Sequence, residues 1–401
     1  MDDIHFRKVV STMGKIIVTI DGNVPSKYAH SFNVMKMAQG FSQCGHKTEV
    51  VSLLSWPIFK EWFKIKNIHY HYGVSKEIKI TLLPVCNKDF YHKTIGAKGF
   101  NARAGRYFKK KKPDLVYCRS YLSVIECIKN RIPCIIETHT TLFDHPDLKK
   151  VFELSRSEYF LGLVTINKLL AEEYSKRGVP KNKILFEEDG VDVSQYNIND
   201  DKLYWRKKLQ IPEEKRIVLY SGGLYKEKGI ESILKTKKLI KDETILFYII
   251  GGTSEQVAEW TSYVDKNKIK NISFLGFKPN SELPGYHKAA DILFMPYDTN
   301  MNYQVMDINS TSPLKLFEYM AAKRPIVTSN IPVIKKIVKN KKEAMLARPN
   351  HHADLVDCIY DLLNDDEKAD KIVNNAFKLA EKYSWENRCK RILGKTTEIT
   401  I

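Results

Sequence analysis

The sequence predicts an α/β protein made of two doubly wound lobes of similar size, each with a parallel sheet covered by helices. Short runs rich in β-branched residues alternate with amphipathic helical patterns along most of the chain. Parallel strands need crossover helices, which this alternation supplies. The alternation starts again after a polar stretch near residue 200. The length of 401 residues is too great for one ordinary domain and suits two.

The first lobe is expected to begin with a strand at 15–21, because KIIVTID is apolar and β-branched. A turn-rich segment and an amphipathic helical pattern follow and end at Gly45. Later strands of this lobe are expected at 48–54, 114–118, 134–139, 161–167 and 183–189. In a doubly wound sheet the ligand binds at the carboxyl ends of the strands, so the turns after these strands are the places to look for a site.

The second lobe is expected to begin near residue 215. Its first strand is expected within 216–224, where it runs into a glycine turn, and the others at 245–250, which ends in a second glycine pair, 272–277, 291–298 and 325–330. We therefore predict an N-terminal lobe at 1–198 and a C-terminal lobe at 199–375. A polar tail helix at 376–401 is expected to pack back on the first lobe.

Composition excludes several classes of protein. The mix of 43% hydrophobic and 28% charged residues is typical of a globular enzyme, and no apolar run approaches the roughly 18–20 residues of a membrane span. The first residues contain no apolar signal core, so a cytoplasmic protein is expected. Seven cysteines without a CxxC pair indicate reduced thiols and not a zinc site or a disulfide frame.

The net charge of +18 indicates attraction to an anion. No helix-turn-helix, zinc-finger or ribonucleoprotein signature accompanies it, so nucleic acid is not an expected partner. A phosphate-bearing ligand or an anionic membrane face explains the excess equally well.

The segment YSGGLYKEKG combines features of a phosphate site. Gly222 and Gly223 directly follow a strand, and Lys228 comes just before the next helix. Exposed backbone N–H groups and a cation at a helix N-terminus suit a diphosphate. The spacing is not the GxGxxG of dinucleotide enzymes. A tight turn with a solvated lysine explains the same residues without any ligand.

The segment STSPLKLFEYM suggests a second phosphate contact. Ser312 has the character of a helix N-cap and Pro313 that of the first helical residue. The hydroxyls of Ser310 and Thr311 lie beside the free N–H groups of that first turn and could help to hold a phosphate. Glu318 follows about one and a half turns later, where a carboxylate can bind ribose hydroxyls. A capped amphipathic helix whose Glu318 faces solvent is the alternative.

These two segments, together with FLGF, ELPGYHKAADILFMPY and EKYSWE, resemble the family-four glycosyltransferases in order and spacing. The resemblance covers nearly the whole chain. It implies the GT-B fold, in which two Rossmann-like lobes face a cleft and a C-terminal helix crosses back to the first lobe. It further implies retaining transfer of a sugar from a UDP- or GDP-linked donor to a hydroxyl of a glycan or lipid-linked acceptor in surface polysaccharide synthesis. The resemblance implies no metal and no other cofactor.

The resemblance also assigns site residues. It implies that Lys228 contacts the donor diphosphate and Glu318 the nucleotide ribose, while His139 approaches the transferred sugar. His139 and Lys228 are the expected catalytic residues. Further donor contacts are implied for Gly22, Asn23, Gly222, Gly223, Ser310, Thr311 and Leu314. For His139, a satisfied structural histidine at the end of a buried strand is the alternative.

Two departures from the family pattern leave the sugar open. The family has paired glutamates eight residues apart, and the position eight before Glu318 is Ser310. The arginine common before the leucine of the glycine turn is replaced by Gly223. A GT-B nucleotide-sugar epimerase is therefore one alternative. A non-catalytic, nucleotide-sugar-binding partner of a polysaccharide assembly complex is the other.

Two features of the first lobe suggest contact with a membrane. Aromatic residues recur at helical spacing within 55–73, with lysines between them, as in an interfacial helix. The stretch 103–114 has six basic residues in twelve, and residues 1–198 carry 31 basic against 20 acidic residues. A buried aromatic helix and an ordinary solvated helix end explain the same residues. The expected localisation is thus cytoplasmic, with peripheral membrane contact as a hypothesis.

Overall fold

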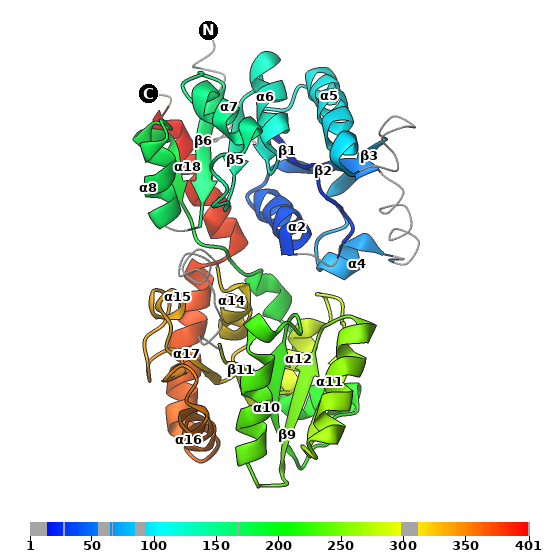
Figure 1. Ribbon diagram of the computed structural model, residues 1–401, viewed down its shortest axis with the longest axis vertical. Helices are drawn as coiled ribbons and strands as arrows, with labels where there is room; N and C mark the ends of the chain where they lie inside the picture. The colour runs from blue at the N-terminus through cyan, green and yellow to red at the C-terminus, as the bar shows by residue number, and fades with distance from the viewer. Residues whose placement is uncertain are drawn as a thin grey trace. The chain divides into compact units, whose positions relative to one another are not determined.

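The structure is a computed structural model that describes residues 14–26, 29–54, 65, 67–84, 93–166, 168–297 and 312–399. The chain forms two compact units (Figure 1). The first consists of Met1–Asp189 with Trp385–Ile401, and the second of Gly190–Ser384. Each unit contains its own parallel sheet, as the alternation of strands and helices predicts.

The sheet of the first unit has seven strands in the order β3-β2-β1-β4-β5-β6-β7. Every pairing is parallel. The strand order reverses direction between β1 and β4, which makes this edge the switch point where ligands of doubly wound sheets bind. The strands are β1 (Lys15–Ile20), β2 (Lys47–Leu54), β3 (Lys79–Pro84), β4 (Leu115–Cys118), β5 (Cys134–Glu137), β6 (Phe160–Thr165) and β7 (Ile184–Phe186).

Helices cover both faces of this sheet (Figure 1). Their apolar faces, together with the buried strands, form a core that includes Phe100, Phe108, Val151 and Tyr174. The helices are α2 (Ala29–Gln43), α4 (Ile68–Tyr72), α5 (Lys93–Lys111), α6 (Tyr121–Lys129), α7 (Pro146–Leu154), α8 (Lys168–Lys176), the 3-10 turn η1 (Lys181–Lys183) and α18 (Trp385–Ile399).

The second unit repeats the design with six parallel strands in the order β10-β9-β8-β11-β12-β13. Its strands are β8 (Arg216–Ser221), β9 (Ile245–Ile250), β10 (Ile272–Gly276), β11 (Ile292–Met295), β12 (Ile326–Ser329) and β13 (Met345–Ala347). The switch point lies between β8 and β11.

The helical elements of the second unit again lie against both faces of its sheet, with apolar clusters on each side. They are η2 (Val193–Tyr196), α9 (Lys202–Leu209), η3 (Lys226–Lys228), α10 (Ile230–Leu239), α11 (Ser254–Lys266), α12 (Leu283–Ala289), α14 (Leu314–Ala321), α15 (Pro332–Lys335), α16 (His352–Leu363) and α17 (Asp366–Lys382). Among the described residues of both units, no helix is long and apolar enough to cross a membrane.

The unit boundaries differ from the predicted 198 and 375. The backbone N–H of Val191 donates to the carbonyl of Tyr383 at 2.9 Å, which ties the chain after residue 189 to the second unit. The expected single tail helix is two helices that separate after Lys382. The first, α17, packs on α14, whereas α18 packs on α2 of the first unit. A Cβ at Gly40 of α2 would lie 2.7 Å from the backbone oxygen of Trp385, so glycine permits this close approach.

Two strands were not predicted from the sequence. Strand β3 lies at the sheet edge with only partly buried residues, and its sequence KITLLP lacks a strong alternation. Strand β13 has three residues, MLA, none of them β-branched. Both are held by pairing with a longer neighbour and not by their own propensity.

Candidate functional site

The two glycine turns of the second unit lie side by side at the carboxyl edge of its sheet. The N–H of Gly222, after β8, donates to the carbonyl of Ile250 at the end of β9, at 2.8 Å. Gly251 has a φ of 120°, and a Cβ there would lie 2.0 Å from the carbonyl oxygen of Gly222. A side chain at residue 251 would therefore push the turns apart.

Lys228 lies where the sequence predicts, at the start of the helix that follows the first glycine turn. It ends η3, and Gly229 then caps α10 with a φ of 82°. A Cβ at Gly229 would lie 2.0 Å from the carbonyl oxygen of Pro296, so this position also requires glycine. The lysine side chain is exposed.

The helix predicted after STSP starts later than expected. Pro313, and not Ser312, occupies the N-cap position, and α14 begins at Leu314. The turn is closed by the backbone instead of a side chain, because the N–H of Leu314 donates to the carbonyl of Ser312 at 3.0 Å. The buried Ser312 hydroxyl finds no partner among the described residues. The predicted contacts Ser310 and Thr311 lie outside the described residues.

Lys315 is a second cation at this site, and the sequence analysis missed it. Its Nζ lies 4.1 Å from the ring centroid of Tyr220 and donates to the Tyr220 hydroxyl at 2.9 Å. That hydroxyl donates in turn to the carbonyl of Gly223 at 2.9 Å. Burial and the nearby charge of Lys228 lower the pKa of Lys315 to about 7, against the opposing charge of Glu318. The sequence spacing could have identified Lys315, since it stands three residues before Glu318 and thus on the same helix face.

Glu318 is partly buried and does not simply face solvent. Its Oε1 accepts a hydrogen bond from Nδ2 of Asn280 at 3.3 Å. Asn280 is only 8% exposed, and its Oδ1, like the hydroxyl of neighbouring Ser281, is buried without a partner in the described part of the chain. Unsatisfied buried polar atoms are rare in folded proteins, so this group next to Glu318 suits a polar ligand.

A buried histidine fixes the end of β8 relative to α14. The ring of His287 lies 2.9 Å from the hydroxyls of both Tyr196 and Ser221. Tyr319, next to Glu318, accepts from the N–H of Ser221 at 2.8 Å. Complete burial lowers the pKa of His287 to about 3, so the ring is neutral and serves as a structural link.

The predicted residues of the first unit follow two strands that are separated by one other strand in the sheet. Gly22 and Asn23 come after β1, and His139 comes after β5, with β4 between them. The hydroxyl of Ser52 donates to the carbonyl of Gly22 at 2.9 Å and fixes the loop after β1. Because the strands are parallel, these side chains belong to one edge of the sheet.

His139 contacts a carboxylate and a guanidinium. Its Nε2 lies 2.8 Å from Oε1 of Glu137 and 3.2 Å from Nη1 of Arg119. Burial and the charge of Arg119 lower the pKa of His139, although Glu137 opposes this shift. The ring is therefore neutral near pH 7.

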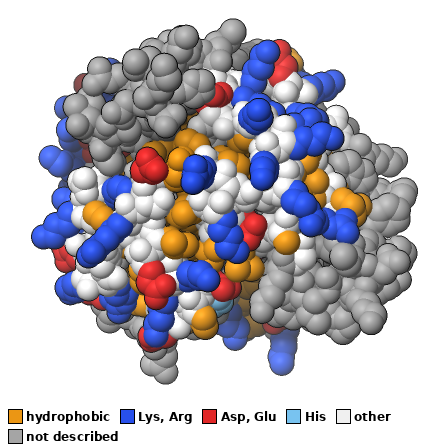
Figure 2. Space-filling model, turned by 90° about the horizontal axis from the view of Figure 1, so that it is seen from above, with side chains coloured by type: hydrophobic (Ala, Val, Ile, Leu, Met, Phe, Trp, Pro, Cys, Tyr) orange, Lys and Arg blue, Asp and Glu red, His pale blue; other side chains and the backbone are white. Residues whose placement is uncertain are grey.

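Of the two features predicted to meet a membrane, the structure describes the basic one, at the end of α5. The basic last turn of α5 precedes Leu115, the start of β4, whereas Leu54 ends β2. Both strands run parallel to β1, so Leu54 and Leu115 lie at opposite edges of the sheet. The aromatic segment 55–64 lies outside the described residues. Figure 2 shows Lys and Arg side chains spread over the described part of one face, with Asp and Glu sparser among them.

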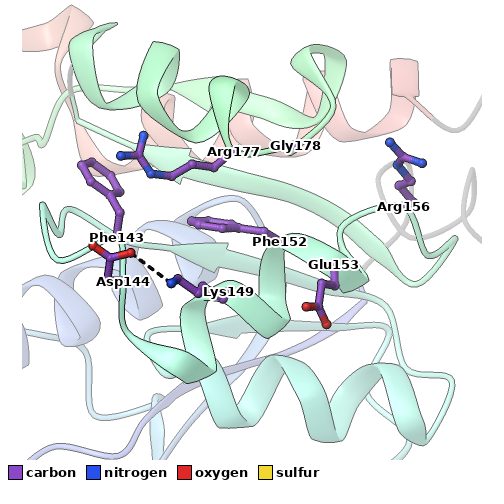
Figure 3. A pocket seen from close by; sticks show the side chains of 8 residues that line it. All are labelled: Phe143, Asp144, Lys149, Phe152, Glu153, Arg156, Arg177 and Gly178. Carbon is purple, nitrogen blue, oxygen red and sulfur yellow. Dashed lines mark ion pairs between the residues drawn. The ribbon is translucent and has the colours of Figure 1, made fainter.

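A hollow of about 570 Å³ between α7 and α8 contains none of the predicted site residues (Figure 3). Three of its charged side chains form ion pairs: Lys149 lies 3.0 Å from Asp144, and Arg177, which stacks over Phe143 at 3.9 Å, pairs with Glu173 outside the lining. We therefore do not treat it as a substrate site.

The described residues contain no group of three or more His, Cys, Asp or Glu side chains that could hold a metal ion. The described cysteines are free thiols, four of them buried.

Comparison with known proteins relates the second unit to a family of transferases. Residues 201–379 match the family model for glycosyl transferases group 1. The uncharacterized glycosyltransferase MJ1607 of Methanocaldococcus jannaschii is 24% identical over 71% of this chain and 75% of its own. The processive diacylglycerol alpha-glucosyltransferase of Acholeplasma laidlawii is 20% identical over 68% of this chain and 81% of its own. The structure of Anabaena HepE with UDP and glucose has a TM-score of 0.69 at 14% identity and covers 96% of this chain and 99% of HepE.

Proposed function

Since the chain is a group 1 glycosyltransferase with the GT-B fold that uses a nucleotide sugar, we propose a specific reaction for it. The enzyme transfers a hexose from a UDP- or GDP-linked donor, with retention of configuration, to a hydroxyl of a glycan or a lipid-linked acceptor. Retention and the role in surface polysaccharide synthesis rest on the resemblance of the motifs. A lipid-linked acceptor is consistent with the similarity to a diacylglycerol glucosyltransferase.

The pair of lysines beside the glycine turn carries the proposal. Lys228 stands at the start of α10, and Lys315 reaches over Tyr220 to the glycine turn after β8. The two are close enough for the charge of one to lower the pKa of the other. The charges of two neighbouring lysines repel each other, and a diphosphate between them would relieve that repulsion.

This arrangement stabilises the leaving group. When the bond between the anomeric carbon and the diphosphate oxygen breaks, its electron pair stays on the diphosphate and the negative charge there grows. Lys228 and Lys315, aided by the N-terminus of α14, offset that charge as it develops. The anomeric carbon then bonds to the acceptor oxygen, whose proton passes to the departing diphosphate or to water. No step in this scheme requires a metal.

The remaining predicted residues position the donor. Glu318 binds the ribose hydroxyls, and Asn280 orients its carboxylate. Ser310, Thr311 and Leu314 line the phosphate and sugar end, and Gly222 and Gly223 let the donor approach the backbone. In the first unit, His139 contacts the transferred sugar and the loop with Gly22 and Asn23 faces the donor.

A thermal-shift screen against UDP, GDP, CDP and their sugar conjugates tests this proposal. A ligand at 100 times its dissociation constant adds about 2.7 kcal/mol of stability, which moves the unfolding midpoint by several degrees. We expect one nucleotide to shift wild type and Glu259→Ala, which removes an exposed carboxylate on α11. The shift should be lost in Glu318→Ala. An equal shift in Glu318→Ala, or no shift with any nucleotide, would contradict the site assignment.

A further inference from the structure

Glu137, at the end of β5, is a fully buried carboxylate with donors from several parts of the first unit. Its side chain is 0% exposed. It accepts hydrogen bonds from Asn33 on α2 (3.3 Å), Tyr117 on β4, His139 (2.8 Å) and Arg388 on α18 (3.0 and 3.2 Å), and it lies 3.3 Å from Arg119. Burial alone would raise the pKa of this carboxyl group, but the two guanidinium groups hold it well below its usual range. Glu137 is therefore an anion inside the protein.

Arg388 brings the C-terminal helix to this carboxylate. Its side chain is also 0% exposed, and both of its terminal nitrogens face Glu137. Its Nε donates to the carbonyl of Glu188 at 2.8 Å, which satisfies the remaining side of the guanidinium. A buried pair of this kind depends on both partners, because either charge left alone in the interior is strongly destabilising.

The contact with Glu137 fixes which ring nitrogen of His139 carries the proton. An ionised carboxylate can only accept hydrogen bonds, so Nε2 at 2.8 Å from Oε1 must carry a hydrogen. Arg119 can only donate, so its guanidinium pairs with the same carboxylate and not with the protonated nitrogen. In the neutral ring Nδ1 is then left as the acceptor.

We propose that Arg388 is a positioning residue for His139. Acting through Glu137, it holds the ring in the Nε2–H tautomer and in one orientation, so that Nδ1 accepts a hydrogen bond from a hydroxyl of the transferred sugar. The C-terminal helix thus shapes the sugar end of the site without touching the substrate. The contact with the sugar rests on the proposed function; the tautomer and its dependence on Arg388 rest on the contacts of Glu137 and on its charge.

The charges around His139 determine in which direction its pKa should change when Arg388 or Glu137 is replaced. Glu137 and Asp189 favour the imidazolium, whereas Arg119 and burial oppose it. Arg388 neutralises much of the field of Glu137. When Arg388 alone is removed, Arg119 still stabilises the negative charge of Glu137. The pKa of His139 should then rise. Removing both charges leaves Arg119 dominant and should lower it.

Nuclear magnetic resonance of the full chain with ¹⁵N-labelled histidine tests this inference without any substrate. The signals of His139 are identified by their loss in His139→Gln. We expect the Nε2–H pattern in wild type. In Arg388→Met the pKa of His139 should rise, because a nearby positive charge is removed. The matched control is Arg391→Met, which removes an arginine from the same helix that pairs with Glu187 instead, and it should leave His139 unchanged.

The double variant Glu137→Gln/Arg388→Met guards against loss of fold, because it removes both buried charges together. It should lower the pKa of His139. An Nδ1–H pattern in wild type would overturn the inference, as would pKa shifts of the same sign in the single and double variants. The proposed function is judged separately by the turnover of His139→Ala, so failure of the sugar contact and failure of the positioning role are distinguishable.

Discussion

The affinity for the nucleotide-sugar donor should depend on pH through Lys315. Its pKa of about 7 in the free protein means that half of the molecules lack this charge at neutral pH. A bound diphosphate favours the charged form and raises the pKa of the lysine. Binding therefore takes up a proton. The affinity should be highest below pH 7 and should fall as the pH rises through the pKa of the free form.

The size of the effect follows from the protonated fraction of Lys315. With a pKa of about 7, this fraction is roughly 0.9 at pH 6 and roughly 0.03 at pH 8.5. If the bound lysine stays charged over this range, the dissociation constant should rise about 30-fold between these pH values, or about 2 kcal/mol. Arginine remains charged throughout, so Lys315→Arg should lose this dependence.

Isothermal titration calorimetry with the nucleotide sugar found in the thermal screen measures the effect. The donor's diphosphate diester has no ionisation in this pH range, so the signal comes from the protein. Titrations in buffers of different ionisation enthalpy count the protons taken up. The matched control is Lys226→Arg, which changes an exposed lysine of η3, two residues before Lys228, and should keep the wild-type dependence. A flat affinity in wild type, or an unchanged slope in Lys315→Arg, would refute the reasoning.

Two further predictions concern the backbone and the membrane. Gly229→Ala should lower the free energy of unfolding by about 2 kcal/mol or more in chemical denaturation, because φ is 82° and the new Cβ would meet the carbonyl of Pro296. The same change at Gly394 in α18, where a Cβ meets nothing within 4 Å, should instead add up to about 1 kcal/mol. If the basic end of α5 binds anionic lipid, Lys110→Glu should weaken low-salt co-sedimentation with anionic liposomes by about 2 kcal/mol, whereas Lys371→Glu on α17 should not. Absence of wild-type sedimentation would end the membrane hypothesis.

Much of the fold could be predicted because buried parallel strands leave a local signal. KIIVTI and ILFYII consist mainly of β-branched, aromatic and other apolar residues, since both faces of these strands are largely buried. The edge strand KITLLP and the three-residue strand at 345–347 have no such pattern, because a neighbouring strand holds them in place. The unit boundaries were equally hard to place, since the bond from Val191 to Tyr383 joins residues far apart in the sequence.

In the candidate site, too, contacts between residues close in the sequence could be predicted, whereas contacts between distant residues could not. Gly222, Gly223 and Lys228 belong to one short loop segment, and Lys315 and Glu318 lie on one helix face. The proximity within each group can therefore be predicted from the sequence spacing. The N-cap at Ser312 was predicted wrongly because the proline after it stays outside the helix. The contact between Glu137 and Arg388 joins residues 251 positions apart, and no sequence pattern near either residue predicts it.

Both units contain a basic side chain that burial and a neighbouring cation keep from being fully charged. Lys228 stands in this relation to Lys315, and Arg119 to His139. A fully charged lysine in the free site would be strongly hydrated, and a ligand would have to displace that water. A lysine that is half neutral before binding gains its charge as the diphosphate arrives, where the charge is useful. In the proposed reaction the histidine, in contrast, meets an uncharged sugar hydroxyl and acts as a neutral acceptor. The difference follows from the partners: Lys315 has a neutral hydroxyl at Tyr220, whereas a buried carboxylate fixes the proton of His139.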